Sequence, residues 1–309
     1  MSIFTNWDKK HTEAFQKDII RVNHSIADTG LFTDEKLVAL LDAHPASHMD
    51  VCLRASHDIY EERFRTGDFR KANGHLLLDL AKNGKIWIQL REVMNMHPEY
   101  SELLDQMYGE LSERTGVKSF KARGGLLITS PIAKTPYHFD PTDTILWHIR
   151  GQKTIYFYPT NKEFLPDEGF EHVLFSQNED YLPYNSEMEK QALAFELQPG
   201  EMISWPLNKP HRVENNSFCV SITAEYSTPA SSFKNSVIYT NAVMRQKFGM
   251  SPSWYGASYP EKLAKAAAGK VLRKMNVLGD LHKTDEVTFK IDPDVPGYIA
   301  DMQPQLRAF

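Results

Sequence analysis

The chain has few cysteines and no long apolar run, and both shortages exclude classes of protein. Only Cys52 and Cys219 occur among its 309 residues, too few for a disulfide framework and without the paired spacing of a zinc site. We expect both to be small core residues. No apolar stretch reaches the roughly 18 residues that span a bilayer, and residues 1–18 are too charged for a secretory signal. These observations predict a cytoplasmic protein without a membrane partner.

An excess of basic residues is missing as well. Lys and Arg total 35 against 40 Asp and Glu, a formal charge of −5, so the composition does not indicate a surface that neutralises phosphates. We therefore expect no nucleic-acid partner. The chain also lacks internal repeats and a Pro/Gly/Ser linker between independent domains.

The apolar periodicity divides the chain into three parts. Residues 1–118 are expected to form helices, including one over residues 7–27, and a strand that pack on the core. Residues 119–228 contain six short runs rich in Ile, Leu, Tyr, Phe and Trp, which predict a β-sandwich or barrel. Residues 229–309 are expected to form a C-terminal helical extension, which either covers the sheet or mediates a homodimer.

One connection within the strand-rich part is unusually long. Residues 161–190 are acidic with scattered aromatic side chains, and they exceed the length of a hairpin loop. Such long connections are commonly functional, so we interpret this one as a functional or lid insertion.

His138 and Asp140 carry the strongest chemical signal in the sequence. They are two residues apart, so in an extended strand both side chains leave the same face and can bind one ion. Two His and one carboxylate are a typical ligand set for iron(II), because they leave neighbouring coordination positions open. His211, after a Pro-Gly turn and a short apolar strand, is the candidate third ligand, although a lone His there equally suits a loop.

The residues that follow His138-Phe139-Asp140 distinguish it from a second His-x-Asp triplet. His48-Met49-Asp50 has the same spacing, but no hairpin with an inward Lys follows it, and we expect a surface turn there that leads into a strand. After Asp140, strand alternation across a Gly-bearing turn places Thr144 and Lys153 on the inward face. A buried Lys is costly unless it meets an anion, which the distal carboxylate of 2-oxoglutarate would supply. Taken alone, Lys153 would more often be a solvated turn residue.

Two blocks of sequence resemble a known family. Residues 126–159 contain a Thr-Pro-x-His-x-Asp opening and a Gly-x-Lys turn, and residues 197–215 contain a Pro-Gly strand followed by a distal His. Both blocks resemble the JmjC and cupin-like 2-oxoglutarate oxygenases, and are similar within that family to the asparaginyl hydroxylase factor inhibiting HIF. The resemblance covers roughly residues 85–226. It implies a mainly β fold with flanking helices, namely a double-stranded β-helix or jelly-roll.

The resemblance also implies roles for individual residues. By position, His138, Asp140 and His211 match the iron(II) ligands, and Lys153 and Thr135 match the pair that holds the 5-carboxylate of 2-oxoglutarate. The pattern departs from the asparaginyl hydroxylase at three places in the co-substrate pocket. Trp87 stands where that enzyme has a Tyr, and Thr144 and Glu225 stand where it has two Asn, so the details of the pocket are open.

The expected activity follows from this resemblance. An iron(II)- and 2-oxoglutarate-dependent dioxygenase would use dioxygen to hydroxylate a C–H bond of a protein side chain or a small molecule, with succinate and carbon dioxide as co-products. Attack beside an N-methyl nitrogen would instead give demethylation. The alternative is a metal-binding cupin without oxygenase activity, such as an isomerase or a small-acid sensor. Lys153 together with Thr135 favours the oxygenase, because the alternative has no evident need for them.

Overall fold

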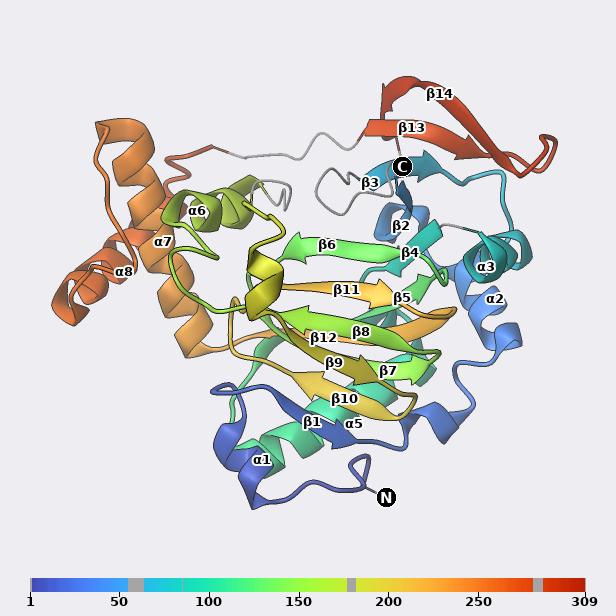
Figure 1. Cartoon of the computed structure of the whole chain (residues 1–309), viewed down its shortest axis with the longest axis horizontal. Coiled ribbons are helices and arrows are strands. Elements are labelled where there is room, and N and C mark those ends of the chain that lie inside the picture. Colours follow the sequence, from blue (N-terminus) through green and yellow to red (C-terminus); the bar gives the residue numbers. More distant parts are fainter. Residues whose placement is uncertain (1, 55–63, 85, 177–181, 280–285, 309) are drawn as a thin grey trace.

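Two β-sheets face each other in the computed structural model, which describes residues 2–54, 64–84, 86–176, 182–279 and 286–308. Helices lie on the outer side of the larger sheet and at one end of the molecule (Figure 1). The prediction of a mainly β fold with flanking helices is confirmed.

The smaller sheet has four antiparallel strands in the order β6-β11-β8-β9. It carries the sequence blocks that include His138, Lys153 and His211. Its strands are β6 (Lys134–His138), β8 (Lys153–Phe157), β9 (Leu193–Leu197) and β11 (His211–Asn215).

The larger sheet has ten strands in the order β1-β10-β7-β12-β5-β4-β2-β3-β13-β14. Along the chain, its four central strands alternate with those of the smaller sheet, except that β8 and β9 are successive strands of the smaller sheet. This is the connectivity of a double-stranded β-helix. They are β5 (Phe120–Thr129), β7 (Asp143–Arg150), β10 (Glu201–Ser204) and β12 (Cys219–Ser227). Strands from both ends of the chain extend the same sheet: β1 (Ile20–Asn23), β2 (Met49–Arg54), β3 (Phe64–Asp68), β4 (Ile86–Leu90), β13 (Glu286–Ile291) and β14 (Ile299–Leu306).

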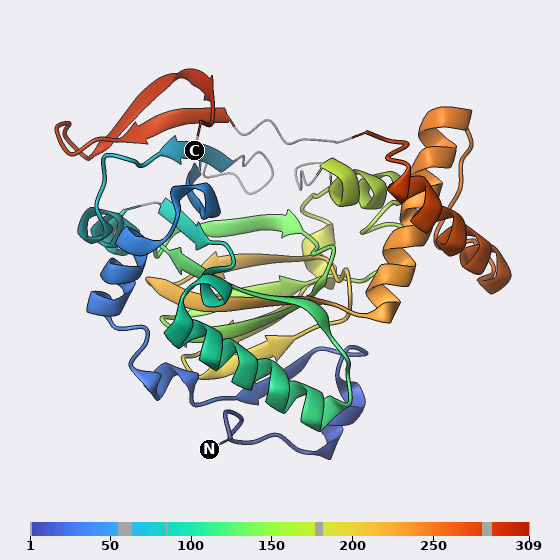
Figure 2. The same cartoon turned by 180° about the vertical axis from the view of Figure 1, so that it is seen from behind.

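Strand alternation gives the larger sheet two apolar faces. On β7, Leu146 packs with Ile155 and Phe157 of the smaller sheet, whereas Ile145 and Trp147 face the core on the other side. Helix α5 crosses that outer face (Figure 2). The helices are α1 (Lys9–Ala14), α2 (Asp34–Ala43), α3 (Gly74–Asn83), α4 (Val93–Met96), α5 (Pro98–Thr115), α6 (Asp167–Ser176), α7 (Pro229–Phe248) and α8 (Tyr259–Lys274).

Two of the predicted helical regions differ from the structure. The helix predicted over residues 7–27 is wrong, because α1 is the one α-helix there among the described residues and β1 pairs with β10 at the edge of the sheet. A 3-10 helix follows over Ile26–Thr29. Ile20 and Val22 are buried on one face of β1, so a period of two decides its structure. The C-terminal part contains α7 and α8 but also the hairpin β13–β14, which joins β3 in parallel.

Cys52 and Cys219 are both buried thiols, as expected. Among the described helices, none is long and apolar enough to cross a membrane.

The turn between β7 and β8 depends on one glycine. Gly151 has φ +85°, and a Cβ atom at this position would lie 2.0 Å from the carbonyl oxygen of Phe218. Only glycine adopts this conformation without strain and leaves the neighbouring backbone in place. The turn thereby fixes the start of β8, where Lys153 lies.

The described parts of the predicted insertion, residues 161–176 and 182–190, are anchored to the rest of the molecule. Glu189 accepts hydrogen bonds from Arg212 on β11, at 2.8 Å and 3.0 Å, and Glu171 on α6 pairs with Arg245 on α7 at 2.9 Å. Residues 177–181 lie outside the described residues. A function as a lid stays a prediction.

Candidate metal centre

Three potential metal ligands meet where β6 ends and β11 begins. His138 is the last residue of β6, His211 is the first residue of β11, and the two are direct partners in the sheet. Asp140 follows two residues after His138, and one of its carboxylate oxygens lies 3.7 Å from Nε2 of His211. One ligand atom from each of the three residues lies within 4.8 Å of the others. The group is thus compact enough to bind a single ion.

The hydrogen bonds of the two imidazoles select the tautomer that a metal needs. Nδ1 of His138 lies 2.7 Å from the carbonyl oxygen of Pro136, and Nδ1 of His211 lies 3.0 Å from that of Lys209. A carbonyl oxygen only accepts, so each Nδ1 carries the proton and each Nε2 presents a lone pair. Metal-bound histidines use this arrangement, with the second ring nitrogen donating to a backbone carbonyl. The residues therefore fit an iron(II) ion with two imidazole ligands and one carboxylate.

Burial keeps one of these rings neutral. Desolvation lowers the pKa of His211 well below its ordinary value, and the neighbouring His138 ring lowers it further. The ring of Trp205 covers His211 with a centroid separation of 4.9 Å, and the ring of Phe157 lies at 5.7 Å. His211 is thus held as the unprotonated ligand form.

Lys153 lies on the face of the smaller sheet that points toward the larger sheet, which we call the inner wall. The two histidines lie on the same face, and Lys153 lies further along β8. Its side chain is 2% exposed and shares a face of the strand with Ile155 and Phe157, which pack between the two sheets. Within the described part of the chain, no carboxylate lies within ion-pair distance of its ammonium group. Burial lowers the pKa of Lys153, while the nearby Cys219 thiol acts in the opposite direction. Such a site favours the arrival of an anion.

Thr135 and Thr144 also point between the sheets. Thr135 is the cross-strand partner of Val213, which packs on the inner core, and opposed residues share a face of the sheet. Thr144 is buried two residues before the inward Leu146 and lies opposite Glu225. The predicted co-substrate residues therefore face the same space between the sheets. Among the described residues, His48 and Asp50 do not belong to the group of potential metal ligands. Asp50 instead pairs with Arg307 at 2.5 Å.

The sequence profile of the Cupin-like domain matches residues 3–232. The chain belongs to this family. Among curated proteins, none matches the sequence closely enough to count as a relative.

Solved structures with the same fold include two of an Escherichia coli protein. The X-ray structure of E. coli ycfD superposes with a TM-score of 0.50 at 15% identity and covers 90% of this chain and 70% of that one. The ribosomal oxygenase YcfD in complex with cobalt and 2-oxoglutarate gives a TM-score of 0.50 at 15% identity, with 91% and 69% covered. These similarities extend the cupin-like fold over most of the chain. The narrower resemblance to the asparaginyl hydroxylase stays a prediction.

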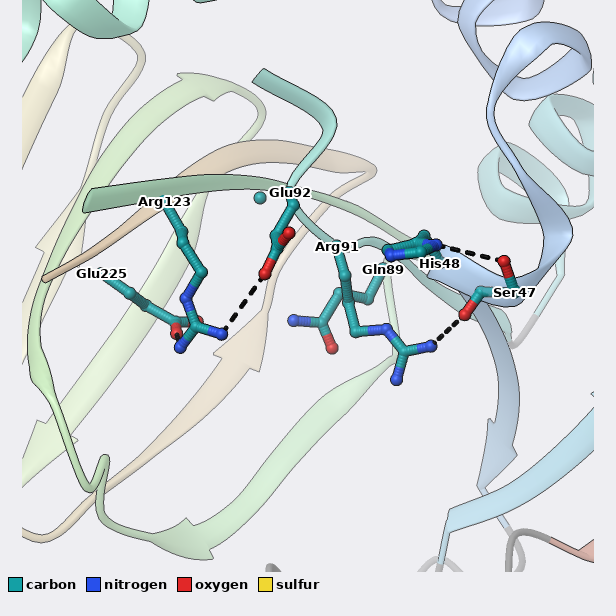
Figure 3. A pocket seen from close by; sticks show the side chains of 8 residues that line it. Ser47, His48, Gln89, Arg91, Glu92, Arg123 and Glu225 are labelled. Atoms are coloured by element: carbon teal, nitrogen blue, oxygen red, sulfur yellow. Dashed lines mark hydrogen bonds and ion pairs between the residues drawn. The ribbon is translucent and has the colours of Figure 1, made fainter. Parts of the chain in front are cut away.

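A cavity of about 240 Å³ opens on the inner face of the larger sheet (Figure 3). Glu225 lies opposite Thr144, which follows Asp140 closely in the chain, so the cavity lies at the same end of the sheets as the metal ligands. Arg123 donates to Glu225 at 2.9 Å and lies 3.4 Å from Glu92. The full lining is Ser47, His48, Gln89, Arg91, Glu92, Arg123, Gly125 and Glu225.

Several residues around the site were not identified from the sequence. Gln89 and Arg123 line the cavity, and Asn208 and Asn235 contact the loop that carries Asp140. The alternation of β4 would have indicated Gln89, which shares its inner face with Trp87. No sequence pattern indicates the two asparagines, because each reaches the loop through tertiary contacts.

We predict opposite effects of Lys153→Met on the stability of the ligand-free protein and on 2-oxoglutarate binding. The pH window of interest lies between the lowered pKa of Lys153 in the folded wild type and its ordinary value of 10.5 in the unfolded chain. In this window Lys153 is protonated in the unfolded state but not in the native state. Wild-type stability should therefore rise with pH across that window. Lys153→Met removes the buried charge, so its stability advantage should be largest below the window and disappear above it, as measured by urea unfolding.

The same variant should bind 2-oxoglutarate about 10- to 100-fold more weakly, since a hydrogen bond to a charged group contributes about 1.5–3 kcal/mol. Isothermal titration calorimetry of the metal-loaded protein measures this affinity. Lys134→Met, which removes a partly exposed lysine from β6, serves as the control. Unchanged affinity in Lys153→Met would contradict the assignment of Lys153.

Proposed function

We propose that this chain is an iron(II)- and 2-oxoglutarate-dependent dioxygenase that hydroxylates a C–H bond. The observation that carries the proposal is the joint placement of the triad and of Lys153. Two imidazoles with free Nε2 lone pairs and one carboxylate meet at one end of the inner wall, and a buried lysine without a carboxylate partner in the described chain lies beyond them. A metal-binding cupin of another activity needs the first feature but not the second.

His138, Asp140 and His211 would hold iron(II), and three protein ligands leave room for a bidentate co-substrate and dioxygen. Iron bound there would supply the oxidation, in which 2-oxoglutarate, dioxygen and R–H become succinate, carbon dioxide and R–OH. The rings of Phe157 and Trp205 pack beside His211 and would limit solvent access on that side of the site. The protein thus orients the reactants and controls solvent access, while the cofactor performs the chemistry.

Lys153 and Thr135 would hold the far carboxylate of 2-oxoglutarate, and Thr144 would line the same pocket. Lys153 is four residues along β8 from Phe157, which contacts His211, so their Cα atoms are about 13 Å apart at the usual rise per residue. A lysine side chain and a five-carbon diacid together bridge such a separation. Trp87 offers an indole N–H where the related hydroxylase has a hydroxyl.

The cavity beside Glu225 is the proposed substrate site. Its lining is polar and carries charges of both signs, which suits a polar side chain of a protein substrate better than an apolar one. The ribosomal oxygenase name of the E. coli structures supports a protein substrate. We place the enzyme in the cytoplasm, where the buried thiols of Cys52 and Cys219 would stay reduced.

The direct test is turnover of radiolabelled 2-oxoglutarate by purified protein with iron(II) and air. We expect release of labelled carbon dioxide that Asp140→Ala and His138→Ala reduce to the level of metal-free protein. A peptide array then identifies the substrate by its stimulation of this release. Arg123→Gln should keep the unstimulated release and lose the stimulation. No release by protein with iron confirmed at the triad would favour the cupin without oxygenase activity.

We further propose that the chain forms a homodimer through α8. This helix packs on α7 and projects from the body of the molecule (Figure 1). Its exposed apolar side chains recur every four residues and form one stripe, which is typical of an interaction surface. A twofold axis would pair the stripe with itself. The stripe consists of Tyr259, Leu263, Ala267, Val271 and Met275.

Light scattering coupled to size-exclusion chromatography tests this proposal. The wild type should elute with twice the mass of the chain, and the double variant Leu263→Lys, Val271→Lys should elute as a monomer with the same circular dichroism spectrum. Lys270→Gln on the same helix should remain dimeric. A monomeric wild type at micromolar concentration would refute the dimer and leave the oxygenase proposal untouched.

A further inference from the structure

We propose that Asn208 and Asn235 act as a clamp that fixes the Asp140 ligand in the direction of the metal. The two side chains come from separate elements, the bend before β11 and helix α7, and donate to consecutive backbone carbonyls of one loop. The inference rests on the proposed iron site and assigns two positioning residues to it. Neither asparagine is a proposed metal ligand.

Asn208 connects the segments that carry two of the ligands. Its Nδ2 donates to the carbonyl oxygen of Asp140 at 2.8 Å, and it precedes His211 by three residues. The side chain is 1% exposed and the backbone has φ +60°, a conformation that Asn adopts more readily than most residues. The hydrogen bond therefore ties the position of the Asp140 backbone to that of the bend that leads into His211.

Asn235 holds the next carbonyl of the same loop. Its Nδ2 donates to the carbonyl oxygen of Pro141 at 2.9 Å from the second turn of α7. The N-terminus of this helix is itself fixed, because Thr228 caps it and donates to Asp143 at 3.0 Å. The C-terminal extension thus contributes a contact to residues 139–142, the loop that carries Asp140. Asn208 and Asn235 hold this loop from two sides.

Stability of the fold alone does not account for these two amides. The Oδ1 atoms of Asn208 and Asn235 are buried, and neither has a hydrogen-bond partner among the described residues. A buried polar atom without a partner costs about 1–3 kcal/mol, which an apolar side chain of similar size would avoid. Within the described part of the chain, each amide makes one side-chain hydrogen bond, and it goes to the loop that carries Asp140, so we assign their role to that loop.

Positioning of this kind has a measurable effect on metal binding. Residues that orient metal ligands typically change metal affinity by about 10- to 100-fold when they are replaced. Asn208→Gly keeps the left-handed backbone conformation and removes the amide. Asn235→Leu keeps the size of the side chain and the helix and removes the donor. Both variants leave all three ligands in place.

The test is a cobalt(II) titration of the purified full-length protein, followed by the visible absorption of the bound ion and by calorimetry. We expect both variants to bind cobalt about 10- to 100-fold more weakly than the wild type and to show an altered visible spectrum. Two control variants should match the wild type. Asn276→Gly changes an exposed residue with φ +51°, and Gln246→Leu removes an exposed amide from α7.

Folding and positioning are separated by unfolding the metal-free proteins. The clamp predicts that Asn235→Leu is at least as stable as the wild type without metal, yet binds cobalt more weakly. If Asn235→Leu does not fold, Asn235→Ala removes the donor with a residue of high helix propensity, and the same titration of that variant decides. Wild-type affinity and spectrum in both variants would overturn the clamp. A wild type that binds no cobalt would overturn the iron site as well, so the two failures are distinct.

Discussion

The antiparallel pairing of β6 with β11 is the constraint on which the rest of the site depends. It brings His138 opposite His211, two residues far apart in the chain, and sets both rings on the inner face. A slip of one residue would turn one ligand to the outside, because side chains alternate between faces. The register shifts between His211 and Val213, and such irregularities are common next to active sites. Here the shift lets His138 and Thr135, three residues apart, share the inner face.

Several buried groups along this inner wall are unfavourable for the folded state by themselves. Lys153 is buried without a carboxylate partner in the described chain. The Oδ1 atoms of Asn208 and Asn235 are buried and accept no hydrogen bond from the described residues. Natural proteins concentrate such features at functional sites and tolerate the cost in stability. These three groups lie beside the ligands and along β8, where a bound metal and a bound acid would complete the site.

The strand-rich part could be predicted from the sequence because its period of two and its turn residues agree. The triad could be proposed because a strand spacing and a nearby Lys153 occurred together. The helix expected over residues 7–27 could not be distinguished from β1, since the pairing of Ile20 and Val22 with β10 is a tertiary contact. For the same reason the hairpin β13–β14, the cavity beside Glu225 and the contacts of Asn208 and Asn235 were not predicted. Each depends on segments that only the folded chain brings together.

The inner wall is proposed to bind iron(II) and 2-oxoglutarate together. The most direct measurement is the visible spectrum of the anaerobic protein with iron(II) before and after addition of 2-oxoglutarate. We expect a weak charge-transfer band from the chelate that appears in the wild type and is absent in His138→Ala. Iron bound at the triad without such a band, at saturating 2-oxoglutarate, would contradict this proposal.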